Sequence, residues 1–246
     1  MKNLIYAAAV LALGACAPAN RDATTTGTTA TAANTTMSTN PAAPTTSSSM
    51  SDLKVQPAAK TAATEGNRPM SYYQNKVAEL HTTAGEIDIR FFPDVAPNHV
   101  KNFVDLAEKG FYNGTKFHRI IPGFMIQGGD PNTISGSPAT WGTGGSGKYV
   151  NAEFSSIKHK RGIVSMARSN DPNSASSQFF IMVADYPSLD NQYSAFGQVT
   201  KGMDVVDKIV SAAATGPEGS RPVNPTTITN IAIRDAKESE KGPTPK

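Results

Sequence analysis

The sequence has few of the residues from which metal and cofactor sites are built. It contains one cysteine, Cys16, in 246 residues. Its four histidines, His81, His99, His118 and His159, lie far apart and lack the spacing of metal ligands. We therefore expect neither a metal centre nor a bound cofactor.

The chain also has only a small excess of charge of one sign. The chain carries 23 Lys and Arg against 20 Asp and Glu, a net charge of +3, and the basic residues are spread out. Proteins that bind nucleic acid concentrate Lys and Arg in one run or on one face. We therefore expect no nucleic-acid partner.

The N-terminus lacks an apolar run long enough to span a bilayer. Residues 4–13 are ten mostly apolar residues, whereas a membrane-spanning helix needs about 20. After the positive start Met1-Lys2-Asn3, this run fits the core of a signal peptide. The following Leu13-Gly14-Ala15-Cys16 resembles a bacterial lipobox, in which the cysteine is acylated. We expect residues 1–15 to be a lipoprotein signal peptide and Cys16 to be lipidated. The alternative is an ordinary secretory signal with an incidental Cys16.

Lipidation of Cys16 implies a place in the cell envelope. Each buried methylene contributes about 0.8 kcal/mol, so several acyl chains form a lasting membrane anchor. The next residue is Ala17, whereas an aspartate there would resemble an inner-membrane retention signal. We expect a lipid-anchored protein of the outer membrane, facing the periplasm, if the host is Gram-negative.

Residues 16–68 are rich in Thr, Ala, Ser and Pro, and residues 23–51 hold no charged side chain. Large apolar residues are nearly absent, so this segment cannot bury enough surface to offset its chain entropy. We expect a disordered tether with a root-mean-square span on the order of 40 Å.

Residues 69–237 have the pattern of a folded domain, and we expect residues 238–246 to be a loose charged tail. Apolar and polar residues alternate at 77–81 and 86–91 around a Thr-Ala-Gly turn, which predicts a hairpin. Further strands are predicted within 117–127, 161–167, 178–183, 194–199 and 226–234, and helices at 97–109 and 203–210. Many short strands with two helices indicate a mainly β fold, a barrel or a sandwich.

Two passages combine polar and large apolar side chains as a peptide-binding pocket does. They are FHRIIPGFMIQGGD at 117–130 and SSQFFI at 176–181, with GTGG at 142–145 between them. Arg119 lies in an otherwise apolar strand, where a buried cation is costly unless it is paired or lines a site. Gln127 and Gln178 can fix hydrogen bonds without adding charge. There is no Ser-His-Asp order with a plausible elbow and no carboxylate pair near a pocket. Binding and polarising a peptide fits these residues, and a core role with Arg119 in a structural salt bridge is the alternative.

Residues 117–130 are very close to the signature of the cyclophilin family of prolyl isomerases. Residues 176–180 resemble its second block and residues 142–145 its glycine loop, and the similarity runs from about Tyr73 to Asp235. The resemblance implies a mainly β fold, a closed eight-stranded antiparallel barrel capped by two α-helices. It places the active site in a groove on the outer face of the barrel.

The resemblance also implies roles for individual residues. Arg119 matches the catalytic arginine, Gln127 matches the glutamine that binds substrate backbone and orients this arginine, and Phe124 belongs to the same catalytic group. The matching substrate-binding residues are Met125, Ala167, Arg168, Gln178, Phe180, Leu189, Tyr193, Gly142, Thr143 and Gly144.

The activity implied is peptidyl-prolyl cis-trans isomerisation, which accelerates rotation about X-Pro bonds. The barrier of about 18–20 kcal/mol arises from amide resonance, and an arginine can donate to the prolyl nitrogen only when rotation has freed its lone pair. The expected partners are proline-containing segments of folding or exported envelope proteins, and we expect a monomer. The alternative is a cyclophilin-like docking module for peptides or proteins whose catalysis is incidental.

Three positions depart from the pattern of the family. Tyr193 stands where many eukaryotic members have His, and it keeps a flat apolar face with a polar tip. Arg168 stands where many members have Asn, and its charge is expected to bias the preference for flanking residues. Ser188 stands where the tryptophan linked to cyclosporin binding would fall, so we expect weak cyclosporin affinity.

Two further features resemble chemical motifs. Residues 142–148, GTGGSGK, nearly fit a phosphate-binding loop, but Tyr149 replaces the required Ser or Thr and no helix pattern follows. His118 is adjacent to Arg119 and resembles an acid–base group. Because neighbouring strand residues point to opposite faces, we expect His118 to be structural.

Overall fold

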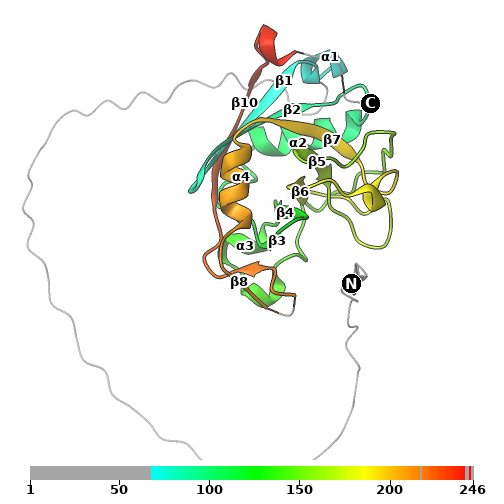
Figure 1. Cartoon of the computed structure of the whole chain (residues 1–246). Helices are drawn as coiled ribbons and strands as arrows, with labels where there is room; N and C mark the ends of the chain where they lie inside the picture. Colours follow the sequence, from blue (N-terminus) through cyan, green and yellow to red (C-terminus); the bar gives the residue numbers. More distant parts are fainter. Residues whose placement is uncertain (1–67, 217, 242–243, 245–246) are drawn as a thin grey trace, which may run out of the picture. The chain divides into compact units, whose positions relative to one another are not determined.

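The computed structural model describes residues 68–216, 218–241 and 244; the predicted signal peptide, Cys16 and nearly all of the tether lie outside the described residues. A short helix, α1 (Met70–Tyr73), leads into the hairpin of β1 (Lys76–Thr82) and β2 (Gly85–Phe91) (Figure 1). Thr82 closes the hairpin, because its Oγ1 accepts hydrogen bonds from the amides of Ala84 and Gly85. The predicted hairpin is confirmed.

Eight antiparallel strands form one sheet in the order β10-β1-β2-β7-β5-β6-β4-β3. The remaining strands of this sheet are β3 (Arg119–Ile121), β4 (Met125–Gly128), β5 (Ile163–Met166), β6 (Phe179–Met182), β7 (Ala195–Lys201) and β10 (Ile228–Asp235). All lie in or overlap the predicted ranges. A separate two-stranded ribbon, β8 (Ala214–Thr215) and β9 (Arg221–Pro222), was not predicted.

The sheet curls, but its edge strands β3 and β10 do not pair as a ladder. The two edges meet just before each strand, where Lys116 bridges Thr227. The outer edge of β3 is occupied differently, since the amide of Ile120 donates to the carbonyl of Ser220 at 2.7 Å. The fold is therefore mainly β, with a curled sheet like a half-barrel. The closed barrel is not confirmed, because the segment before β9 holds the edge that closure would use.

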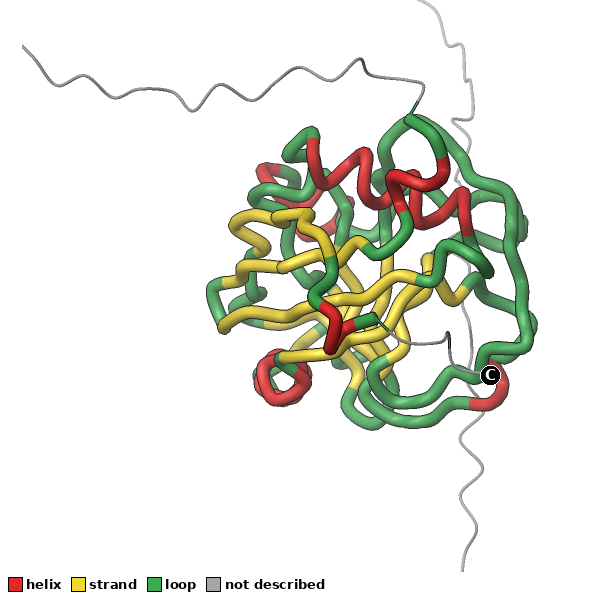
Figure 2. Tube along the Cα trace, turned by 90° about the horizontal axis from the view of Figure 1, so that it is seen from above, coloured by secondary structure: helices red, strands yellow, loops and turns green. Residues whose placement is uncertain are grey.

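Two helices cover the curled sheet, α2 (Pro97–Glu108) and α4 (Met203–Val210). Figures 1 and 2 show the strands lying between them. From α2, Phe103 enters the main core, where its ring centroid lies 5.0 Å from that of Tyr112 and 5.3 Å from that of Phe179. Both helices match the predictions. Within the described part of the chain, no helix has the length and apolarity needed to cross a membrane.

The N-terminus of α2 is capped from a distant loop. Its N-cap residue, Ala96, has no side-chain acceptor. The carboxylate of Glu153 accepts instead from the amide of Asn98 at 3.1 Å and from that of His99 at 3.0 Å. The amide of Glu153 donates to Oγ of Ser194 at 2.9 Å. Glu153 thus joins α2 to the chain just before β7.

The segment after β10 is held against the sheet. A short 3₁₀ helix, η3 (Glu238–Glu240), brings the carboxylate of Glu240 to the guanidinium of Arg234 at 2.7 Å. Arg234 also pairs with Glu79 and Asp88. The loose tail expected from residue 238 is therefore corrected for these residues, because a network of opposite charges fixes them.

Candidate active site

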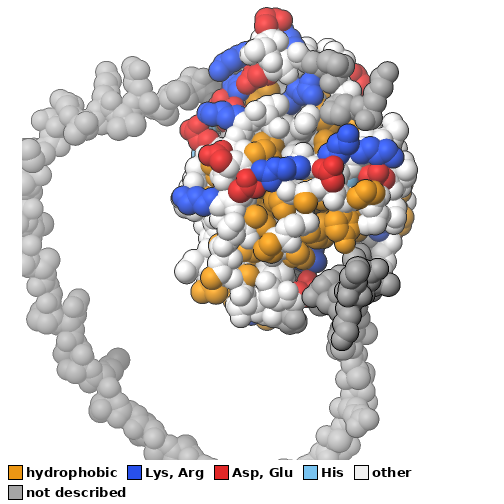
Figure 3. Space-filling view, in the orientation of Figure 1, with side chains coloured by type: hydrophobic (Ala, Val, Ile, Leu, Met, Phe, Trp, Pro, Cys, Tyr) orange, Lys and Arg blue, Asp and Glu red, His pale blue; other side chains and the backbone are white. Residues whose placement is uncertain are grey.

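A second apolar cluster lies apart from the main core, around β4 and β6. It gathers the apolar residues among those predicted for catalysis or substrate binding: Phe124, Met125, Ala167, Phe180, Leu189 and Tyr193. Figure 3 shows hydrophobic side chains gathered on this face, over the area where Figure 1 places β4 and β6, with charged side chains around them. The structure therefore brings these residues together from four segments of the sequence, and we call this cluster the predicted pocket.

The alternation of side chains along β4 and β6 creates this pocket. In β4, Ile126 points into the main core, whereas Met125 belongs to the second cluster. In β6, Phe179 enters the main core and Phe180 the second cluster. Because side chains alternate between faces along a strand, the adjacent pair Phe179-Phe180 serves both sides of the sheet.

The cluster combines deeply buried side chains with partly exposed aromatic ones. Met125, Phe180 and Leu189 are at most 6% exposed. The Tyr193 ring stands edge-on to Phe180, with ring centroids 5.6 Å apart, and Phe124 is partly buried. An apolar surface of this kind can pack against an apolar ring and exclude water from the contact.

Arg119 lies at the edge of this pocket. It pairs with Gln127 across β3 and β4, which places both side chains on the pocket face of the sheet. Its Nε and Nη2 donate to Oε2 of Glu218 at 3.3 and 3.2 Å. The arginine is thus paired, as the structural alternative required, but its partner is exposed and the pair borders the pocket.

The predicted contact between Gln127 and Arg119 is not present as a hydrogen bond among the described contacts. Nε2 of Gln127 donates instead to Oε1 of Gln178 at 2.9 Å. Nε2 of Gln178 donates in turn to the carbonyls of Gly142 at 2.9 Å and Gly144 at 2.8 Å. The two glutamines therefore tie the glycine loop to the strand beside the arginine.

The glycine loop adopts a shape that other residues would not allow. Gly142 has φ +88°, and a Cβ on Gly144 would collide with Oδ1 of Asp130. The same carboxylate accepts from the amide of Gly142. Thr143 is exposed, and its hydroxyl donates to the carbonyl of Thr140 at 2.7 Å. The loop therefore borders the pocket at Gln178, as expected for a neighbouring subsite.

Arg168 lies over Tyr193 on the other side of the pocket. Its guanidinium carbon is 4.7 Å from the centroid of the Tyr193 ring, and Nε and Nη2 donate to the carbonyl of Gln192 at 3.2 and 3.1 Å. A guanidinium over an aromatic ring is attracted to it. The amide of the preceding Ala167 donates to the carbonyl of Gln178 at 2.9 Å. The two departures from the family pattern, Arg168 and Tyr193, thus contact each other.

The sequence did not reveal a row of buried, hydrogen-bonded polar side chains beside the pocket. His159 lies 3.3 Å from Asp190 through Nδ1 and 2.9 Å from the hydroxyl of Ser165 through Nε2. Burial lowers the pKa of His159, and Asp190 opposes this effect. Ser165 has no exposed surface, so this Ser-His-Asp arrangement cannot reach a substrate. It ties the turn bearing Leu189 to β5.

His118 is buried beside Arg119, near Gly142 of the glycine loop. It is 6% exposed, whereas the Arg119 side chain is 33% exposed. Burial lowers the pKa of His118, with the charge of Asp130 opposing this effect. Because this imidazole is buried and is poorly protonated, we assign it a structural role.

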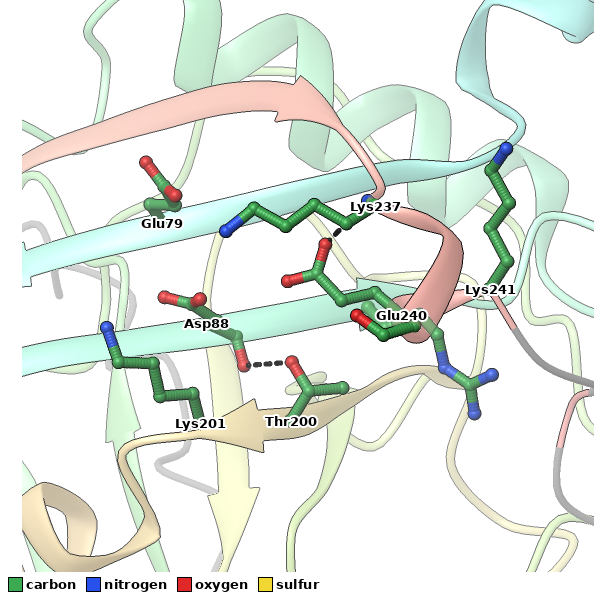
Figure 4. Close-up of a pocket in the computed structure, with 9 residues that line it drawn as sticks. Glu79, Asp88, Thr200, Lys201, Lys237, Glu240 and Lys241 are labelled. Atoms are coloured by element: carbon green, nitrogen blue, oxygen red, sulfur yellow. Dashed lines mark hydrogen bonds between the residues drawn. The ribbon is translucent and has the colours of Figure 1, made fainter.

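A polar hollow of about 590 Å³ lies elsewhere, beside β1, β2, β7 and the segment after β10. Figure 4 shows acidic and basic side chains from these elements facing one another across it. Its lining includes Glu79, Asp88, Lys201 and Glu240 and none of the predicted site residues. Because Arg234 pairs with three of these carboxylates, we interpret the hollow as a solvated salt-bridge network and not as the active site.

The structure thus combines a curled antiparallel sheet with an apolar cluster beside Arg119, and comparison with known proteins identifies its family. The model of the cyclophilin type peptidyl-prolyl cis-trans isomerases matches residues 77–233. The chain belongs to this family.

Three relatives illustrate the similarity. Peptidyl-prolyl cis-trans isomerase A of Dickeya dadantii is 43% identical over 161 residues, which cover 63% of this chain and 82% of that protein. The mouse peptidylprolyl isomerase domain and WD repeat-containing protein 1 is 38% identical over 174 residues, 70% of this chain but only 26% of that protein. A cyclophilin type isomerase of Cryptosporidium parvum, crystallised in the presence of the dipeptide Ala-Pro, superimposes with a TM-score of 0.58 at 32% identity. The match covers 65% of this chain and 99% of that one.

Proposed function

We propose that this protein catalyses the cis-trans isomerisation of X-Pro peptide bonds. The observation that carries the proposal is the position of Arg119 on the same face of the sheet as the apolar pocket around Phe180. A proline ring seated in that pocket brings its nitrogen to the side of the sheet where the guanidinium lies. Family membership and the named relatives support the same activity.

For catalysis, this site must bind the twisted X-Pro amide more tightly than the planar one. In the planar ground state the prolyl nitrogen lone pair is delocalised, and it is a poor acceptor. At the top of the rotation barrier the nitrogen becomes pyramidal and can accept from Arg119, so the enzyme binds this state best. An acceleration of about 10⁵ corresponds to roughly 7 kcal/mol of such preference. The dry pocket wall strengthens the hydrogen bond.

The rest of the site holds the peptide backbone. Gln127, with its amide nitrogen committed to Gln178, keeps its oxygen available to a substrate amide. The glycine loop at Gly142–Gly144 and the half-buried Ala167, which directly follows β5, would border an extended chain. These contacts orient the residue before proline, so that only the prolyl end rotates.

The direct test is exchange spectroscopy by NMR on an Ala-Pro peptide with catalytic amounts of the purified full-length protein. The cis and trans signals should exchange much faster than the uncatalysed tens to hundreds of seconds. Binding without faster exchange would reject the enzyme and favour the docking module.

We further propose that the protein is a monomer anchored through lipidated Cys16 in the outer membrane, where it acts on exported proteins. The sequence 13–16 and the short apolar run before it support this proposal. Cys16→Ser should release the protein from the membrane fraction and abolish labelling with a fatty-acid analogue. Unchanged membrane association of this variant would contradict the anchor.

A further inference from the structure

Glu218 is brought to the arginine of the site by a docked loop. It lies between β8 and β9, where the amide of Gly219 donates to the carbonyl of Gly216 at 2.9 Å and forms a turn. The next residue, Ser220, accepts from the amide of Ile120 at 2.7 Å. Because Ile120 directly follows Arg119, this backbone contact fixes the turn beside the arginine.

The carboxylate of Glu218 faces both Arg119 and solvent. Its Oε2 accepts from Nε and Nη2 of Arg119, and the hydroxyl of Ser220 lies 3.5 Å away. The Glu218 side chain remains 41% exposed. The nearby cation Arg221 is directed elsewhere, toward the carbonyl of Pro138 at 3.5 Å. A negative charge therefore stands at the outer end of the site, just beyond the guanidinium.

The opposite end of the site carries a positive charge. Arg168 follows β5, and β5 is separated from β3 by β6 and β4. Three strand spacings of about 4.8 Å place β5 roughly 14 Å from β3, the strand that carries Arg119. The pocket residues Met125 and Phe180 lie on the two strands between. A peptide that crosses the sheet there passes a carboxylate on one side of its proline and a guanidinium on the other.

We propose that Glu218 determines specificity: it selects X-Pro segments with a basic side chain on the flank that passes Arg119 and disfavours acidic ones. The proposal rests on the prolyl isomerase activity proposed above and defines its substrate class. When the peptide engages the Arg119 guanidinium, the next side chain of the peptide meets the carboxylate of Glu218. Charges at exposed sites of this kind change the association rate more than the affinity, and salt screens their effect.

The test uses the full-length protein and peptides with an Ala-Pro core and Lys, Gln or Glu at either flank. Both kcat/KM and Kd are measured at low and at physiological ionic strength. At low ionic strength the wild type should prefer Lys over Glu on one flank by about three- to tenfold. Glu218→Gln should remove this preference, and Glu218→Lys should reverse it. Glu238→Gln, at a side chain that is 88% exposed on η3, should leave the preference unchanged.

The ratio between Lys and Glu peptides separates charge selection from a general loss of activity. A Glu218→Gln protein that is folded by circular dichroism and keeps the wild-type ratio on both flanks would overturn the proposal. If the neutral Gln peptide is not isomerised by the wild type, the proposed function fails. The Kd values then still decide whether Glu218 selects charge.

Discussion

Gln127 and Gln178 are joined side chain to side chain by a 2.9 Å hydrogen bond from Nε2 of Gln127 to Oε1 of Gln178. The orientation of this pair is set by the glycine loop, because Nε2 of Gln178 is committed to two carbonyls there. The hydrogen bond uses the amide nitrogen of Gln127 and leaves its oxygen as an acceptor for substrate. The loop, the glutamines and the strand beside Arg119 form one connected unit.

Replacing Gln178 should therefore impair catalysis without touching Arg119. Gln178→Ala removes three hydrogen bonds and lets the amide of Gln127 rotate. We expect kcat/KM to fall by about tenfold, and the free energy of unfolding to fall by about 1–3 kcal/mol because the bonds to two loop carbonyls are lost. Gln74→Ala, at an exposed position outside the site, is the matched control. A Gln178→Ala enzyme with wild-type kcat/KM would show that the loop is not part of the site.

The fold should lose stability in mild acid. Burial lowers the pKa values of His99, His118 and His159, so the folded state resists protonation at these sites. The unfolded chain protonates its histidines near pH 6.5. As the pH falls below this value, the unfolded state takes up more protons and is stabilised.

Each such histidine adds a slope of up to about 1.4 kcal/mol per pH unit until its folded-state pKa is reached. Urea unfolding between pH 7.5 and 4.5 measures this loss, and NMR titration of the imidazole signals assigns it. A free energy of unfolding that stays constant over this range would contradict the assignment.

The cap of α2 provides a separate test of the fold. Glu153 supplies the carboxylate that Ala96 lacks, at the positive end of the helix dipole. Glu153→Ala should lower the free energy of unfolding by about 1–2 kcal/mol, whereas Glu86→Ala at an exposed strand position should change it little. Equal effects of the two variants in chemical denaturation would show that the cap contributes nothing.

Ser188 explains the weak cyclosporin affinity that we predict. This residue is exposed on the turn before Leu189, and it offers no indole to a bound macrocycle. Ser188→Trp should tighten inhibition by cyclosporin about tenfold or more, since a buried tryptophan contact is worth more than about 1.4 kcal/mol. Inhibition of the unmodified protein as tight as that of Trp-bearing relatives would contradict the prediction.

Much of the fold follows from local sequence. The alternation at 77–91 predicts β1 and β2, because a half-buried strand has a period of two. The apolar residues after Pro97 recur with the 3.6-residue period of a helix and so predict α2. The ribbon of β8 and β9 has only two residues per strand, too few for periodicity to mark them. The segment before β9 occupies the edge of β3 that would otherwise pair with β10. The closed barrel predicted from the resemblance could therefore not be corrected from the sequence.

The site residues could be predicted where the family resemblance covers them. Contacts between residues far apart in the sequence could not. Phe124, Met125 and Phe180 meet in the pocket as expected. Glu218 lies 99 residues from Arg119, and Gly216-Pro-Glu-Gly219 indicates a turn but not what the turn contacts. The same holds for Glu153, whose role depends on a loop reaching another element.

The central claim is that Arg119 stabilises the twisted X-Pro bond. The measurement that tests it most directly is NMR exchange of an Ala-Pro peptide by the full-length protein, by Arg119→Ala and by Arg119→Lys. Because the pair with Glu218 is exposed, both variants should fold, which circular dichroism checks. We predict fast exchange with the wild type, a loss of about 100-fold or more with Arg119→Ala, and only partial rescue by lysine, which lacks the planar fork. A folded Arg119→Ala protein that isomerises the peptide at the wild-type rate would contradict the account.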